Sequence, residues 1–164
     1  RQGGQVKGID LSETPLVVAK IHAKEQNLHV NYQSISAEAL AIQEPESFDI
    51  VTCMEMLEHV PNPAAIVEAC AQLVKPRGHI FFSTINRNLK SFLLAIVGAE
   101  YILNLLPKGT HEYEKLIRPS ELDRWIRHAC LRTNEIIGMT YNPVNKSYKL
   151  SKNTSVNYII HARK

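Results

Sequence analysis

Three observations predict an α/β fold with a parallel sheet. Short apolar runs of strand length alternate with helical patterns from Val6 to Ile85, which is the order that a parallel sheet with right-handed crossover helices requires. The run Phe48 to Cys53 is near-continuously apolar, as is typical of a strand covered on both faces. The tail 134–163 carries two or three further strand patterns separated by turn residues.

The elements follow one another with recognisable start and stop signals. A first strand runs from Val6 to Leu11, and Ser12 to Pro15 supply the cap and first turn of a helix. Asn62-Pro63 begins a second clear helix, whose inward face is expected to be Ile66, Ala69, Cys70 and Leu73. The remaining predictions are strands at 29–35, 48–53, 79–85, 136–137, 148–150 and 156–160, and helices at 37–43 and 119–129.

Composition and charge limit the classes of function. The 164 residues carry a formal charge of only +3, and the Lys and Arg residues are scattered, so the sequence indicates no nucleic-acid partner. The cysteines Cys53, Cys70 and Cys130 are far apart and form no C-x-x-C pair. This spacing argues against a disulfide framework or a cysteine zinc site and favours a reducing compartment.

Polar residues follow two of the predicted strands. Asp10 ends the first strand, where a carboxylate can accept hydrogen bonds from both hydroxyls of a ribose. The alternative is that Asp10 belongs to the turn and caps the next helix. At the end of the 48–53 strand, VTCMEMLEHVPNP (51–63) brings Glu55, Glu58 and His59 into five residues.

The spacing of these three residues leaves several chemistries open. If residues 54–59 form a helical turn, Glu55 shares a face with Glu58 and His59. Two carboxylates and an imidazole could then hold a divalent cation, or the cluster could supply a general base. The simplest alternative is a solvated acidic turn with a weak Glu–His pair.

The sequence resembles the ubiquinone-biosynthesis O-methyltransferase family over essentially its whole length. The segments that carry the resemblance are VTCMEMLEHVPNP, KPRGHIFFSTINRN (75–88), VGAEYILNLLPKGTHEYEKLIRPSEL (97–122) and VNYIIHARK (156–164). The resemblance implies a Rossmann-like class I methyltransferase sheet, mostly parallel with an antiparallel C-terminal strand. It further implies S-adenosylmethionine as cofactor and O-methylation of polyprenylated phenol or catechol intermediates of ubiquinone biosynthesis.

Site residues are carried over from the family by position. Asp10 resembles the ribose-binding acid and Met54 the residue that lines the adenosyl group. Leu11, Ser36 and Ala37 fall where such folds place neighbours of the adenine. The positions thought to hold magnesium match Glu55, Glu58 and His59, and His59 is the expected catalytic base if no metal binds.

One part of the family pattern is not present in this sequence. The first strand and the glycine-rich loop near the methionine part of the cofactor are expected upstream of Arg1, since RQGGQVKGID opens without a cap or an initiator Met. We therefore expect residues 1–164 to be a single, N-terminally incomplete domain with an apolar helical insertion at about 87–118. These residues alone should bind S-adenosylmethionine poorly, which calorimetric titration would test.

Residues 91–106, SFLLAIVGAEYILNLL, are strongly apolar but too short to span a bilayer as a helix. Arg87, Lys90 and Lys108 flank them, as in a helix that lies on an anionic membrane surface. The alternative is a lid or core helix packed inside the protein. A polyprenylated substrate favours the membrane, which predicts a cytoplasmic protein at the inner membrane face, with other ubiquinone-biosynthesis enzymes as partners.

Two other functions compete with this prediction. One is a methyltransferase that acts on a soluble phenol, and the other is a catalytically silent, membrane-attached binding module. The sequence upstream of Arg1 distinguishes the silent module, because a glycine-rich turn there would complete the cofactor site.

Overall fold

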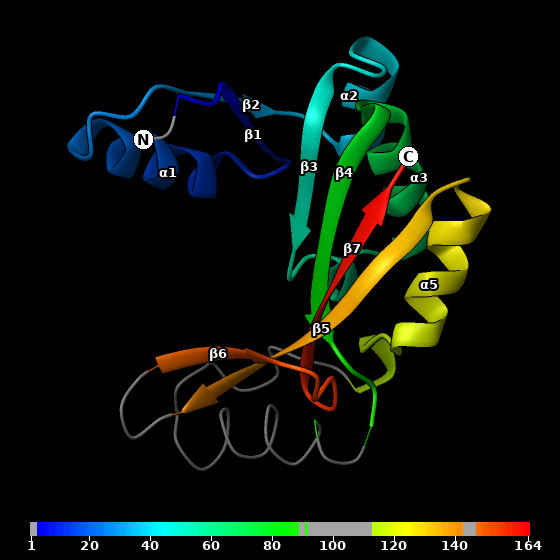
Figure 1. Ribbon diagram of the computed structural model, residues 1–164. Helices are drawn as coiled ribbons and strands as arrows, with labels where there is room; N and C mark the ends of the chain where they lie inside the picture. The colour runs from blue at the N-terminus through cyan, green and yellow to red at the C-terminus, as the bar shows by residue number, and fades with distance from the viewer. Residues whose placement is uncertain (1–2, 89–90, 92–112, 143–146) are drawn as a thin grey trace. The chain divides into compact units, whose positions relative to one another are not determined.

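The computed structural model describes residues 3–88, 91, 113–142 and 147–164. The chain divides into two compact units, Arg1–Glu44 and Pro45–Lys164, which are described separately (Figure 1). The predicted order of helices and strands is confirmed in both units, with boundaries that differ by a few residues at most elements.

The first unit is a β-α-β-α segment. It contains β1 (Val6–Asp10), α1 (Glu13–Glu25), β2 (Val30–Ser34) and α2 (Ala37–Gln43). The two strands are parallel and in register from Val6↔Val30 to Asp10↔Ser34, so their carboxyl ends lie side by side. Helix α1 turns Leu16 and Ala23 inward, and Leu40 and Ala41 are the buried residues of α2.

The second unit is a five-stranded sheet with helices. Its elements are β3 (Phe48–Met54), η1 (Leu57–His59), α3 (Pro63–Leu73), β4 (Val74–Ile85), η3 (Tyr113–Lys115), α5 (Pro119–His128), β5 (Arg132–Asn142), β6 (Ser147–Ser151) and β7 (Asn157–Arg163). The strand order is β3-β4-β7-β5-β6.

The sheet of the second unit contains both parallel and antiparallel strands, as the family resemblance implies. Strands β3 and β4 are parallel, but β7 runs antiparallel to both β4 and β5, and β6 runs antiparallel to β5. The antiparallel pairs all involve the tail, where the chain makes three successive strands without crossover helices and β7 inserts between β4 and β5. The antiparallel C-terminal strand itself is confirmed.

Strand β3 lies at the edge of its sheet. The sequence predicts that this strand is covered on both faces, but within this unit it is not. Cys53 is its one buried residue. Residues 75–78, just before the predicted strand 79–85, already belong to β4, and its pairing with β3 has a register shift between Phe48 and Ile50. Gly78 is required there, because a Cβ atom would lie 2.9 Å from the backbone oxygen of Asp49.

The two faces of the sheet differ in burial. Ile80, Phe82 and Thr84 of β4 pair with Ala162, Ile160 and Tyr158 of β7, and all six are fully buried. Helix α3 packs against β3 and β4, and α5 against β5 and α3; Figure 1 shows both helices on the same side of the sheet. The core of this unit therefore lies between that face and the two helices.

The opposite face carries the alternate residues of the same strands. His79, Phe81 and Ser83 of β4 pair there with Arg163, His161 and Ile159 of β7. The Nδ1 atom of His79 lies 2.9 Å from Nε2 of His161, and the ring of Phe81 stacks on His161 with centroids 4.7 Å apart. Most of these side chains are half-buried.

The apolar segment 91–106 lies outside the described residues except for Ser91, and so does most of the insertion predicted at about 87–118. Among the helices that the structure describes, none is long and apolar enough to cross a membrane.

Candidate active site

The first unit brings its predicted cofactor residues to one edge. Asp10 and Ser34 are register partners at the ends of β1 and β2, and the Ile35 N–H donates to the Asp10 carbonyl at 3.1 Å. Asp10 and Leu11 are therefore adjacent to the start of α2, where Ser36 and Ala37 lie. Ligands bind parallel sheets at this carboxyl end of the strands.

The side chain of Asp10 is exposed and already makes one contact. Its Oδ1 atom accepts a hydrogen bond of 2.8 Å from the Ser12 N–H, which is the turn role that the sequence left open. A carboxylate has four acceptor positions on two oxygens, so this contact leaves capacity for ribose hydroxyls. The chemistry at Asp10 therefore fits a nucleoside.

Leu11 and Ser36 differ in what they offer to a ligand. Leu11 is 75 % exposed, so an apolar surface is available next to Asp10. The Ser36 hydroxyl instead accepts the Ala39 N–H at 3.1 Å as the cap of α2. Ser36 thus has a structural role, and contact with adenine at this corner would come from its backbone or from Ala37.

In the second unit, Glu55 is fixed at the end of β3 by Ser83. The backbone of Glu55 is left-handed, with φ +50°, a conformation that is uncommon for residues other than glycine. Its N–H donates to the carbonyl and to the hydroxyl oxygen of Ser83, at 3.0 and 3.1 Å. The Ser83 hydroxyl in turn donates to Glu55 Oε1 at 2.7 Å.

Glu58 lies in a different environment, with only 3 % of its surface exposed. Its Oε2 atom accepts the Thr84 hydroxyl at 2.7 Å, and its Oε1 atom has no hydrogen-bond partner among the described residues. Burial and the negative charges of Glu58, Glu121 and Glu55 raise the pKa of Tyr158 far above its usual range. Tyr158 therefore stays protonated and donates to the Ile117 carbonyl at 2.9 Å.

Residues 54–59 do not form the helical turn on which a shared face depends. Glu55 is left-handed, and only Leu57–His59 form a short 3₁₀ turn, so the spacing rule for one helical face does not apply. Within the described residues, no group of three or more His, Cys, Asp or Glu side chains could hold a metal ion. Carboxylates suit magnesium chemically, but Glu55, Glu58 and His59 do not converge in this arrangement.

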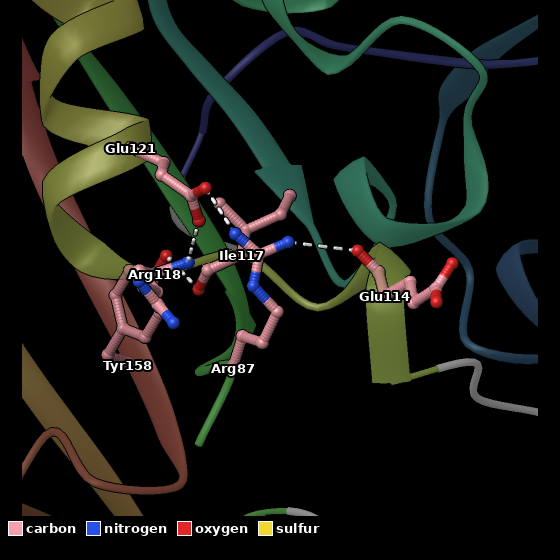
Figure 2. A network of polar contacts seen from close by, with 6 residues as sticks. All are labelled: Arg87, Glu114, Ile117, Arg118, Glu121 and Tyr158. Carbon is pink, nitrogen blue, oxygen red and sulfur yellow. Dashed lines mark hydrogen bonds and ion pairs between the residues drawn. The ribbon is translucent and has the colours of Figure 1, made fainter.

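Sequence reasoning missed a polar network beyond the end of β4 (Figure 2). The guanidinium of Arg87 forms an ion pair with Glu121 and donates to the Glu114 carbonyl at 3.0 Å. Glu121 Oε2 also accepts the Arg118 N–H at 2.9 Å, at the start of α5. Arg87 is thus occupied within the protein, which argues against its predicted role as a basic flank facing a membrane.

Comparisons with known proteins identify the family. A family model described as a methyltransferase domain matches residues 1–82. The ubiquinone biosynthesis O-methyltransferase of Saccharophagus degradans is 59 % identical over 165 residues, covering 100 % of this chain and 70 % of that protein. The protein of the same name from Azoarcus sp. is 60 % identical over 164 residues, with the same coverage.

Solved structures agree on the fold. A SAM-dependent methyltransferase from Methanosarcina mazei has a TM-score of 0.70 at 18 % identity. The match covers 99 % of this chain and 83 % of the Methanosarcina chain. A SAM-dependent methyltransferase from Aquifex aeolicus has a TM-score of 0.64 at 13 % identity. The match covers 99 % of this chain and 70 % of the Aquifex chain. The predicted Rossmann-like methyltransferase fold is confirmed, and the chain belongs to the ubiquinone biosynthesis O-methyltransferase family.

Proposed function

We propose that this protein methylates a hydroxyl group of a polyprenylated phenol or catechol in ubiquinone biosynthesis. The observation that carries the proposal is identity of 59–60 % over the whole chain to relatives with that named activity. When bound, S-adenosylmethionine would supply a methyl group on a positively charged sulfur; formation of the bond from the substrate oxygen to the methyl carbon would break the carbon–sulfur bond in line and release S-adenosylhomocysteine.

The first unit is proposed to hold the nucleoside part of that cofactor. The exposed Asp10 carboxylate would accept hydrogen bonds from the ribose hydroxyls, and Leu11 with the Ser36-Ala37 corner would contact the adenine. Support comes from the adjacent carboxyl ends of β1 and β2, which bring these residues to one edge. Met54, half-exposed at the end of β3, is proposed to line the adenosyl group.

His59 and Glu55 are proposed to act on the hydroxyl that receives the methyl group. Both are exposed, whereas Glu58 is buried. A phenol attacks as its anion, so a proton must leave the oxygen, and imidazole is the usual acceptor near neutral pH. We assign proton removal to His59 and orientation of the hydroxyl to the Glu55 carboxylate, which together align the oxygen with the methyl carbon.

A magnesium requirement is a separate proposal. A cation shared by Glu55, Glu58 and His59 needs Glu58 to turn away from Thr84, because that carboxylate is buried and hydrogen-bonded there. Methylation would be measured with chelator and with added magnesium, in the wild type and in Glu58→Gln. A magnesium response that Glu58→Gln abolishes supports the shared ion, and activity that ignores both treatments excludes it.

The protein is proposed to bind its substrate at the membrane surface and to contact other enzymes of the pathway there. This proposal depends on the sequence of 91–106 and on the apolar tail of the substrate, since that segment lies outside the described residues. Liposome co-sedimentation would be compared between the wild type and a variant with Leu93→Glu and Ile96→Glu. Equal binding by both proteins would reject a membrane role for the segment.

Transfer of a labelled methyl group tests the main proposal. The sequence would be expressed within a chain of its relatives' full length and assayed with prenylated and unprenylated catechols. We expect methylation of the prenylated catechol and much slower methylation of the other. Equal rates favour a methyltransferase for soluble phenols, and no transfer to either favours a silent binding module.

A further inference from the structure

Two neighbouring hydroxyls of β4 hold the two glutamates of the candidate site. The Ser83 hydroxyl donates to Glu55 Oε1 and the Thr84 hydroxyl to Glu58 Oε2, each at 2.7 Å. Successive side chains of a strand point to opposite faces of the sheet. The carboxylates of Glu55 and Glu58 are therefore held on opposite faces.

The Thr84 face is the interior of the second unit. Thr84 pairs with Tyr158 across β4 and β7, and both side chains are fully buried. Glu58 joins them with 3 % of its surface exposed, and its charge contributes to the raised pKa of Tyr158. Thr84 holds Oε2 of this carboxylate inside the unit, whereas Oε1 has no hydrogen-bond partner among the described residues.

The Ser83 face carries the carboxylate of Glu55, just after the carboxyl end of β3. Glu55 is exposed there and directly follows Met54, which is proposed to line the cofactor. Three contacts with Ser83 fix both the left-handed backbone and the carboxylate of Glu55. Left-handed backbone in a residue with a side chain persists where surrounding contacts determine it, often at functional sites.

We propose that Ser83 is a positioning residue for methyl transfer, which acts by holding Glu55 toward the substrate hydroxyl, and that Thr84 and Glu58 form a structural pair. This assignment rests on the proposed function. It divides two glutamates that the sequence treats as equivalent ligands, and it adds a serine from a different strand to the machinery of the reaction.

Steady-state methylation by matched variants tests the assignment, again within a chain of the relatives' full length. Ser83→Ala should lower kcat about tenfold to a hundredfold, because a small misplacement of an aligning group has effects of this size. The KM for S-adenosylmethionine should change little. Ser83→Thr, which keeps a hydroxyl, should recover most of the rate, whereas Thr84→Val should lower the melting temperature and leave kcat near the wild-type value.

A double-mutant cycle separates positioning from a general structural effect. In the Glu55→Gln background, Ser83→Ala should cause little further loss of kcat, because its effect passes through the carboxylate. The assignment would be overturned if the losses of kcat in Glu55→Gln and Ser83→Ala multiplied in the double variant, or if Ser83→Ala kept wild-type activity. It would also be overturned if folded Thr84→Val lost as much kcat as Ser83→Ala. An inactive wild type would instead refute the proposed function, and the positioning role with it.

Discussion

Tyr158 illustrates at the level of one residue how burial determines chemistry. Its hydroxyl is surrounded by protein, donates to the Ile117 carbonyl and lies near the charges of Glu58, Glu121 and Glu55. Water cannot stabilise a phenolate at this position, and the three carboxylates oppose it. The pKa of Tyr158 is accordingly raised far above the usual value of 10.0.

This shift predicts a loss of stability in alkaline solution. The unfolded chain releases the tyrosine proton above about pH 10, while the folded protein retains it, so the folded state binds more protons and the free energy of unfolding falls as pH rises. Below that pH the contribution of Tyr158 is fully present. Above about pH 10, this one group should lower the free energy of unfolding by an amount that approaches about 1.4 kcal/mol per pH unit.

Urea unfolding between about pH 8.5 and 11 measures that slope. Tyr158→Phe should be less stable than the wild type at neutral pH by about 1 to 2 kcal/mol, since the buried Ile117 carbonyl loses its donor. Its stability should nevertheless fall less steeply with pH. Tyr148→Phe, at an exposed tyrosine of β6, serves as control, and identical slopes in Tyr158→Phe and wild type would contradict the argument.

The limits of sequence reasoning are clearest at Glu55 and Glu58. Their spacing and their place after a strand predicted a cluster of acids at the carboxyl edge, and the structure does bring Glu55 to that edge. Spacing could not reveal that Glu55 adopts a left-handed backbone. Nor could it reveal that Ser83 and Thr84, which lie 28 and 26 residues after their glutamates, direct the carboxylates to opposite faces. Those outcomes depend on contacts between strands, which a periodicity does not encode.

At the level of elements, the ion pair of Arg87 and Glu121 joins the end of β4 to the start of α5. The side chains of the pair are about one-quarter exposed, at 25 % and 27 %, and Glu121 also accepts the Arg118 N–H at the beginning of the helix. Charge-assisted bonds of this kind are stronger than bonds between neutral groups. The network therefore fixes where α5 begins.

Disrupting this pair should destabilise the second unit. We expect Arg87→Met to lower the free energy of unfolding by about 2 kcal/mol, because it leaves Glu121 and the Glu114 carbonyl without their shared donor. Urea denaturation provides the measurement. Lys75→Met removes the partner of Asp49 at an exposed ion pair and should lower the free energy of unfolding much less. Similar losses of stability in both variants would show that the Arg87 network stabilises the unit no more than an exposed ion pair does.

Local patterns predicted which elements exist, whereas the antiparallel C-terminal strand was predicted only through the family resemblance. Caps, turns and apolar stripes located each described α-helix, since these signals are local. In α3, for example, Asn62 accepts the Ala65 N–H at 3.3 Å, and the four expected inward residues are all buried. The tail strands were also found. Their antiparallel order around β7 depends on partners distant in the chain, so composition and periodicity left it open.

At the level of the molecule, the second unit owes its core to one face of one sheet. Phe82, Ile160 and Tyr158 on that face are fully buried, and so are Leu122 and Ile126 of α5. The alternate residues of β4 and β7 face the other way and are mostly half-buried. Stability of this unit should therefore depend strongly on which of two neighbouring side chains is removed.

Phe81 and Phe82 provide that comparison within one strand. Phe82→Ala should lower the free energy of unfolding by about 3 to 5 kcal/mol, as expected for a large buried side chain that leaves a cavity. Phe81→Ala loses mainly its stacking on His161, whose ring centroid lies 4.7 Å away, and should cost about 1 kcal/mol. Because the two variants delete the same atoms, unfolding curves of equal midpoint would contradict the assignment of a buried and a half-exposed face. A larger loss in Phe81→Ala would place the core of the unit on the face that carries Ser83 and Glu55.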